Sequence, residues 1–314
     1  MKLINPIYDA SFKYIMEDQK VAKFFLEILL DKKIEIASFK PQEIIIRNTA
    51  SENKSFSAPR MDFIATILET TTNEQTQETT TKRKKVLIEL QQCLNASDIT
   101  RFRSYLGKNY SYQDINDGKK EDLEIITIYI LGFSIQTPVA VIQTSKELID
   151  VSTKQKIEQT KDEIEWIAKL NHTSIFIDVT QLNAKIQTKV EKLLAVFNPE
   201  FRDANKTTIT IPDEIISELK SLNTEDKMPN PLIQKLETAL LDHEVIYQID
   251  QQEQHILHVK NLEEKARGEG KIEGKIEGER QKAIETAKKM KAKGFEMQDI
   301  VEISGLSPQE IQNL

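Results

Sequence analysis

Two carboxylates and an amide stand within short apolar segments of this sequence. Glu89 and Gln91 lie in VLIELQQ, residues 86–92, and Asp62 lies in MDFIATIL, residues 61–68. Both segments are typical of β-strands. Because strand side chains alternate between two faces, Glu89 and Gln91 share one face of their strand. A charged carboxylate in such apolar surroundings is unfavourable by several kcal/mol unless a cation accompanies it.

A divalent metal ion is the partner that this arrangement favours. If the two strands form a hairpin, Asp62 and Glu89 converge, and neighbouring carboxylates repel unless one takes up a proton. Mg²⁺, or Mn²⁺, binds carboxylate oxygens together with waters and phosphate, and it activates water for attack on a phosphodiester. The amide of Gln91 would orient that water. The alternative is an ordinary turn aspartate and a solvent-exposed glutamate.

Residues 97–113 carry the apolar spacing of a helix. Asp98, Arg101 and Tyr105 share one face by the i, i+3, i+4 rule. An arginine–tyrosine face beside a carboxylate pair suits phosphate contact. The alternative is that Arg101 pairs with Asp98 or with another nearby carboxylate. The opposite face, which we expect to pack on the core, comprises Ile99, Phe102 and Leu106.

The motifs RMDF, VLIELQ and RFRSYLGKNYSYQ, in that order after an N-terminal YDASFKYIM, resemble the PD-(D/E)xK nuclease superfamily. More narrowly, they resemble its recombination-promoting nuclease and transposase group, in which E-x-Q usually replaces E-x-K. The C-terminal EGKIEGE and KAKGFEMQDIVEISGLSPQEIQNL are also similar to that group, so the resemblance covers nearly the whole chain. It implies a restriction-endonuclease-like core and Mg²⁺-dependent cleavage of DNA, in recombination or as part of a mobile element.

The resemblance also implies roles for single residues. Asp62 and Glu89 would be metal ligands, and Gln91 would take the place of the lysine that positions water. Asp9 would be an accessory acid. Glutamine has no positive charge and cannot lower the pKa of water as lysine does. The alternative is therefore a catalytically inactive nuclease-fold protein that binds nucleic acid or partner proteins. The implied DNA-binding residues are Lys13, Arg101, Tyr105 and Gln113, to which this chain adds Arg103.

Apolar periodicity predicts an α/β core with a helical C-terminal half, and the resemblance implies a mixed central sheet flanked by helices. Residues 69–85 contain no apolar side chain, so we expect a long solvated loop there. Residues 8–16 are compatible with a lead-in turn or a first helix. The expected strands are 43–47, 61–68, 85–90, 123–131, 139–144 and 174–179. The expected helices are 21–30, 97–113, 157–170, 182–197, 213–222 and much of 231–259.

We divide the chain into a nuclease-like domain, residues 1–225, a helical extension, residues 226–262, and a charged helical tail, residues 263–314. In the tail Gly270, Gly274 and Gly278 recur every four residues, and each glycine costs a helix roughly 1 kcal/mol against alanine. A lone helix in this segment would therefore be only marginally stable. Packing against a partner chain would offset the loss of helix stability that the glycines cause.

The last twenty residues, 295–314, are predicted to form two short helices. Gly305 would end the first, and Ser307 to Glu310 would cap the second. Their rhythm resembles a helix-turn-helix, but they contain four acidic residues and no Lys or Arg. Such a surface is unfavourable for DNA. We therefore interpret the tail as an oligomerisation or partner-binding module.

The composition limits the remaining function classes. The 314 residues carry a net charge of −7, so any contact with nucleic acid must be local. The single cysteine, Cys93, excludes an internal disulfide and a cysteine-based zinc site. We find no run of 18 apolar residues that would indicate a membrane span. These features predict a soluble cytoplasmic protein without membrane partners.

Overall fold

The computed structural model describes residues 1–40, 63–72, 79–92, 98–111, 114–116, 118–144, 148–149, 152, 156–157, 172–183, 186–222 and 230–314. Contacts divide the chain into two compact units, Met1–Asp250 and Gln251–Leu314. This boundary differs from those expected after residues 225 and 262. The helix α7 (Pro231–Ala239) belongs to the first unit because its apolar face is buried in that unit's core.

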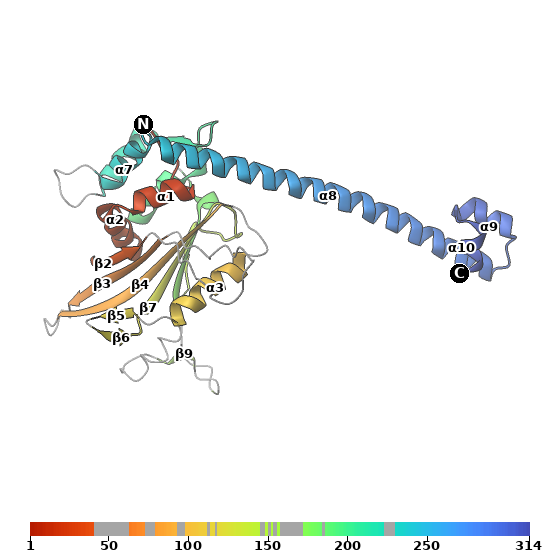
Figure 1. The fold of residues 1–314 in the computed structure, drawn as a ribbon, viewed down its shortest axis with the longest axis horizontal. Coiled ribbons are helices and arrows are strands. Elements are labelled where there is room, and N and C mark those ends of the chain that lie inside the picture. The colour runs from red at the N-terminus through yellow and green to blue at the C-terminus, as the bar shows by residue number, and fades with distance from the viewer. Residues whose placement is uncertain are drawn as a thin grey trace, which may run out of the picture. The chain divides into compact units, whose positions relative to one another are not determined.

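A six-stranded mixed sheet forms the centre of the first unit, in the order β2-β3-β4-β7-β11-β8 (Figure 1). The first three strands pair antiparallel, β4, β7 and β11 run parallel, and β8 is an antiparallel edge strand. The α/β fold class with a mixed sheet is therefore confirmed. The strands are β2 (Ile34–Lys40), β3 (Phe63–Thr72), β4 (Thr79–Gln91), β7 (Glu124–Leu131), β8 (Val141–Gln143) and β11 (Thr173–Asp178).

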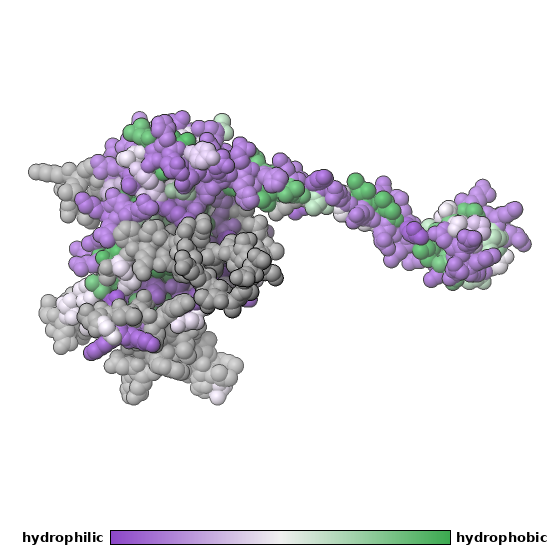
Figure 2. Space-filling view, in the orientation of Figure 1, coloured by the Kyte–Doolittle hydropathy of each residue, from purple (hydrophilic) through white to green (hydrophobic). Residues whose placement is uncertain are grey.

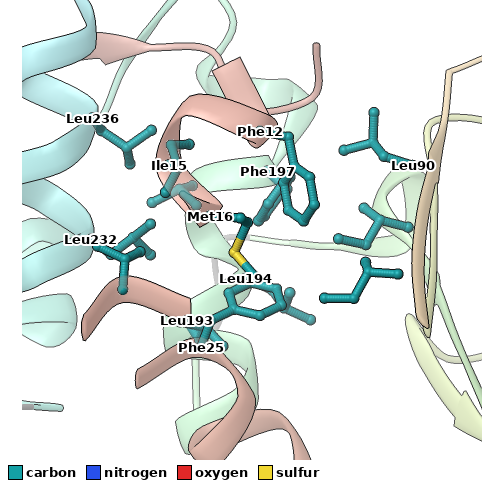
Figure 3. Packing of buried hydrophobic residues seen from close by; sticks show 14 of the residues in the cluster. Phe12, Ile15, Met16, Phe25, Leu90, Leu193, Leu194, Phe197, Leu232 and Leu236 are labelled. Carbon is teal, nitrogen blue, oxygen red and sulfur yellow. The ribbon is translucent and has the colours of Figure 1, made fainter. Parts of the chain in front are cut away.

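Helices cover both faces of this sheet. Alternate residues of β4, namely Val86, Ile88 and Leu90, belong to the large core that α1 (Asp9–Met16), α2 (Gln19–Leu30) and α7 share. Figure 3 shows part of that packing, with Phe12 and Met16 of α1 between Leu90 and the leucines of α7. On the other face, Leu87 packs in a smaller cluster with Tyr105 and Ile125. Tyr105 belongs to α3 (Asp98–Ser111), which Figure 1 shows on the far side of β4 from α1 and α2.

The β3–β4 hairpin is longer than expected. Residues 69–72 and 79–85, predicted as solvated loop, continue the two strands, with Glu69 opposite Lys82 and Thr72 opposite Thr79. The β-branched threonines suit extended backbone. Ion pairs also stabilise this end of the sheet, because Glu69 pairs with Lys84 at 2.8 Å and with Lys32. The hydrophobic pattern missed these residues because charge pairs and threonines, rather than apolar side chains, occupy them.

Several other elements differ from the expectation. Among the described residues of the range 182–197, only α5 (Lys189–Leu194) is an α-helix, because Thr188 and Glu191 form a capping box that begins the helix there. The 3-10 turns η2 (Val179–Gln181) and η3 (Ala195–Phe197) flank it, and η4 (Pro199–Phe201) follows. The expected strand 43–47 and residues 158–170 of an expected helix lie outside the described residues. The strand pairs that the sequence did not indicate are β1 (Lys2–Ile4) with β12 (Thr208–Thr210), β5 (Asp114–Asn116) with β6 (Lys119–Glu121), and β9 (Leu148–Ile149) with β10 (Lys156–Ile157).

The expected helix 213–222 forms as α6 (Asp213–Lys220). In the C-terminal part of the chain, α8 runs from His243 to Ala292 and is followed by α9 (Met297–Ser304) and α10 (Pro308–Gln312). Gly305 ends α9 with φ 70°, and Ser307 with Glu310 forms the capping box of α10, as predicted. The second unit has a small core of its own, which comprises Ala287, Met290, Ile300, Leu306 and Ile311. No helix among the described residues combines the length and the apolar character that a membrane crossing requires.

Candidate functional site

The predicted glutamate lies on a central strand of the sheet. Glu89 lies opposite Tyr129 of β7. Only 3% of the surface of Glu89 is exposed. Leu87, two residues earlier, packs on the α3 side, so strand alternation places Glu89 and Gln91 on the same side. The site is therefore built between the last residues of β4 and the helix α3 that follows this strand.

Arg101 of α3 binds both of these side chains. Its Nη2 donates a hydrogen bond to Oε1 of Glu89 at 3.1 Å and another to Oε1 of Gln91. The side chain of Glu89 is 4% exposed, whereas that of Arg101 is 38% exposed. The guanidinium also lies 5.3 Å from the ring centre of Phe102. Arg101 thus supplies positive charge to a buried carboxylate from a partly exposed position. The sequence had left open whether Arg101 pairs with a nearby carboxylate, and Glu89 is that carboxylate.

The predicted division of α3 into two faces was partly wrong. Tyr105, expected on the phosphate-binding face, is only 5% exposed and packs against Leu87 and Ile125. Ile99, expected in the core, is 57% exposed. Phe102 and Leu106 do pack on the core as predicted, and Arg103 is exposed. The i, i+3, i+4 rule identified neighbours along the helix, but the position of the sheet decides which of them are covered.

Asp9 and Lys13 pair with each other on α1. Nζ of Lys13 lies 2.8 Å from Oδ2 of Asp9. Oδ1 of Asp9 is buried and accepts no hydrogen bond from the described part of the chain. Nε2 of Gln92 donates to the carbonyl of Ile7 at 2.9 Å, which ties the end of β4 to the residues just before α1. The start of α1 is therefore held beside the end of β4.

Aromatic rings lie next to the buried carboxylate. Tyr129 stacks on Phe176 with ring centres 5.0 Å apart, and the ring centre of Phe102 lies 5.3 Å from that of Tyr129. Burial raises the pKa of the Tyr129 hydroxyl, and the negative charge of Glu89 raises it further. A hydrogen bond with Thr127 acts in the opposite direction. Tyr129 therefore stays a neutral phenol beside Glu89.

Two residues that the sequence did not single out shape the strand ends near the site. A Cβ on Gly132 would lie 3.0 Å from the Cα of Gln92, and its backbone N–H donates to the carbonyl of Gln91 at 2.8 Å. Asp178, fully buried, accepts hydrogen bonds from Thr180 and from the backbone of Ile135. The contacts of Gly132 with Gln92 and of Asp178 with Ile135 join residues far apart in the chain, so no local pattern could have indicated them.

Asp62, Cys93 and Gln113 lie outside the described residues. Within the described ranges, no three or more His, Cys, Asp or Glu side chains are grouped so that they could hold a metal ion. Of the predicted site residues, the structure brings together Glu89, Gln91 and Arg101. It pairs Lys13 with Asp9, and it buries Tyr105 in the core.

Comparisons with protein families, with curated proteins and with solved structures each return no match. Any function proposed for this chain therefore depends on the geometry of the site and on the sequence motifs.

Proposed function

We propose that this protein is a metal-dependent DNA endonuclease of the PD-(D/E)xK type, acting in recombination or within a mobile element. One observation carries the proposal. A glutamate that is 3% exposed lies beside Gln91 at the end of a central strand, and its arginine partner reaches it from a solvent-accessible position. Burying a carboxylate costs folding free energy. A buried carboxylate with a specific charged partner is therefore a candidate for a functional site.

The order of the elements around Glu89 supports the proposal. Three antiparallel strands lead into α3, and the next strand of the sheet, β7, returns parallel to β4. Parallel strands need a crossover connection, which is usually a helix, and the resemblance to the nuclease superfamily implies a mixed sheet flanked by helices. Glu89 and Gln91 stand at the end of β4, directly before that crossover.

The carboxylate of Glu89 suits one side of a site for a hard cation such as Mg²⁺. Mg²⁺ usually takes one or two carboxylates and completes its shell with waters and phosphate oxygens. Glu89 would supply one carboxylate and Asp62 the other. Asp62 directly precedes Phe63 in the sequence. Phe63 in turn pairs with Ile88, the residue before Glu89. When bound, the ion would activate water and stabilise the charge that develops on the phosphate.

Each described side chain has a distinct task in this proposal. Glu89 contributes negative charge to the cation site. The carbonyl oxygen of the Gln91 side chain accepts from Arg101, and the amide group of this side chain would orient the attacking water. Arg101 positions Gln91 and, from its partly exposed position, contacts a phosphate oxygen. Asp9 would be an accessory acid through its buried Oδ1.

Plasmid cleavage tests the proposal. Supercoiled plasmid is incubated with the purified protein and Mg²⁺ or Mn²⁺, with and without EDTA. We expect nicking or linearisation that EDTA stops and that Glu89→Gln and Asp62→Asn abolish. Glu69→Gln is the matched control, because Glu69 is also a buried, ion-paired carboxylate of this sheet. Glu69 lies opposite Lys82 in the strand register, and Lys82 is seven residues, or roughly 23 Å, from Glu89 along β4, so this variant should keep its activity. Cleavage that survives both site substitutions would refute the assignment.

A catalytically inactive protein that binds nucleic acid is the second candidate. The observation that favours it is the ion pair of Arg101 with Glu89, which already neutralises the carboxylate without a metal ion. Titration of the protein with Mn²⁺ in a calorimeter separates the two candidates. Heat of binding that disappears in Glu89→Gln supports the nuclease. If there is no such heat and no cleavage, but DNA is retained in a mobility-shift assay, the binding protein is the better description.

A further inference from the structure

The middle of α8 is a helix that no other described element covers. Residues 264–282 are all exposed, and they include Ile272 and Ile276 at 63% and 61% exposure. In Figure 2 the hydrophobic colour recurs along this part of α8 between hydrophilic stretches. Two exposed isoleucines four residues apart form one apolar face of the helix. This face is independent of the proposed nuclease site.

Between residues 267 and 277 the charged side chains are sorted onto two sides of the helix. Arg267, Lys271 and Lys275 follow one another at four-residue spacing, and we call them the positive stripe. The negative stripe has the same spacing two residues further along the chain and comprises Glu269, Glu273 and Glu277. With 100° of rotation per residue, the two stripes flank the isoleucine face on opposite sides.

Contacts within the helix explain only part of this pattern, namely the ion pair of Lys275 with Glu279 at 3.9 Å. Neighbours four residues apart in each stripe carry like charges, which destabilises a single helix. The glycines at 268, 270, 274 and 278 weaken the helix further, and a Cβ at any of them would meet nothing within 4 Å. A single helix would be more stable with alanines and with opposite charges at four-residue spacing. The sequence therefore suits a partner that lies against this segment.

We propose that the partner is a second copy of this chain, whose α8 packs in parallel and in register along Ile272 and Ile276. A two-fold axis parallel to the helices places the positive stripe of each copy against the negative stripe of the other. Lys271 of one copy and Glu273 of the other then differ by about 3 Å in height along the axis. An antiparallel pair on the same face would instead bring positive against positive stripe. Charge complementarity therefore selects the parallel dimer.

Charge-exchange variants of the full chain test this pairing. The positive variant carries Glu269→Lys, Glu273→Lys and Glu277→Lys. The negative variant carries Arg267→Glu, Lys271→Glu and Lys275→Glu. Sedimentation equilibrium of the wild type should give twice the 36.1 kDa mass of the chain. Each variant alone should dissociate with a constant more than about tenfold higher, since opposite-charge contacts become like-charge contacts. An equimolar mixture of the two variants should restore the dimer.

The variant with all six exchanges is the matched control. It keeps like charges within each stripe and loses the ion pair of Lys275 with Glu279, but its two stripes are again complementary, so it should dimerise. A wild type that stays monomeric at every attainable concentration would overturn the proposal. So would single-stripe variants that dimerise as well as the wild type, or a mixture that does not associate. Circular dichroism of all variants at the same protein concentration is the control. The helix content should be lower in the variants that do not dimerise than in those that do.

Cysteine cross-linking then tests the direction of the helices. Ile272→Cys is made in a Cys93→Ser background, since Cys93 is the single native cysteine. In a parallel, in-register pair, the two introduced thiols face each other, and a mild oxidant should join them into a covalent dimer. Gly274→Cys, which lies on the face away from the isoleucines, should not cross-link. If Ile272→Cys links only when it is mixed with Ile276→Cys, the pair is antiparallel and the proposed direction is wrong.

Discussion

Replacement of Arg101 by methionine tests whether the buried Glu89 depends on this cation. Methionine keeps much of the apolar length of the side chain but removes the guanidinium. Removing one partner of a buried ion pair costs about 3–5 kcal/mol. Because the Arg101 side chain is 38% exposed, water replaces part of the lost interaction. We therefore expect a loss of about 2 kcal/mol in the free energy of unfolding, or about 4–8 °C in Tm.

A double-mutant cycle isolates the interaction. Urea unfolding is measured for the wild type, Arg101→Met, Glu89→Gln and the double variant. Since Gln at position 89 leaves no charge uncompensated, the double variant should be more stable than Arg101→Met alone. A coupling energy below about 0.5 kcal/mol would show that Glu89 does not depend on Arg101. Arg103→Met is the control on the same helix, because Arg103 is exposed and its loss should change stability by less than about 0.5 kcal/mol.

Magnesium connects this stability measurement to the proposed function. In Arg101→Met the carboxylate of Glu89 lacks the guanidinium, so a cation that binds there would stabilise the folded state by mass action. We expect added Mg²⁺ to raise the Tm of Arg101→Met and to have no such effect in the double variant. An equal response in both variants would place the binding of Mg²⁺ elsewhere in the chain.

Contacts outside this pair lead to three more predictions. The ion pairs with Lys32 and Lys84 lower the pKa of Glu69 from its ordinary value of 4.5 against the effect of burial. Glu69 therefore contributes stability above pH 4.5 that is lost as the pH falls through its folded pKa. Urea unfolding should therefore show the wild type to be more stable than Glu69→Gln at neutral pH. The difference in the free energy of unfolding should become smaller as the pH falls below 4.5. A difference that does not change with pH would contradict this prediction. Gly132→Ala should lower Tm and the rate of plasmid cleavage together, because its Cβ would press on Gln92 at 3.0 Å; unchanged values of both would show that the strand ends adjust freely. Ser307→Ala removes the capping box of α10 and should cost about 1 kcal/mol, seen as faster hydrogen exchange in residues 308–312 with no change in the sheet; unaltered exchange there would contradict it.

Local patterns in the sequence were sufficient for the elements that carry their own signal. The alternation in residues 86–91 placed Glu89 and Gln91 opposite the large core, as the clusters around β4 confirm. Gly305 and the capping box at Ser307 set the two short C-terminal helices, because turn and cap chemistry acts over only a few residues. The α/β class followed from strands and helices that each show a clear period.

Tertiary structure decided everything that depends on which surfaces meet. Helical spacing could not tell that Tyr105 would be covered and Ile99 left in solvent, because that depends on where the sheet lies. The strand extensions around Glu69 and Lys84 depend on charges brought together across a hairpin. The need for glycine at position 132 arises from Gln92, forty residues away in the chain. Arg101 could be recognised as a basic residue from its type alone, but only the crossover from β4 into α3 brings its guanidinium to Glu89.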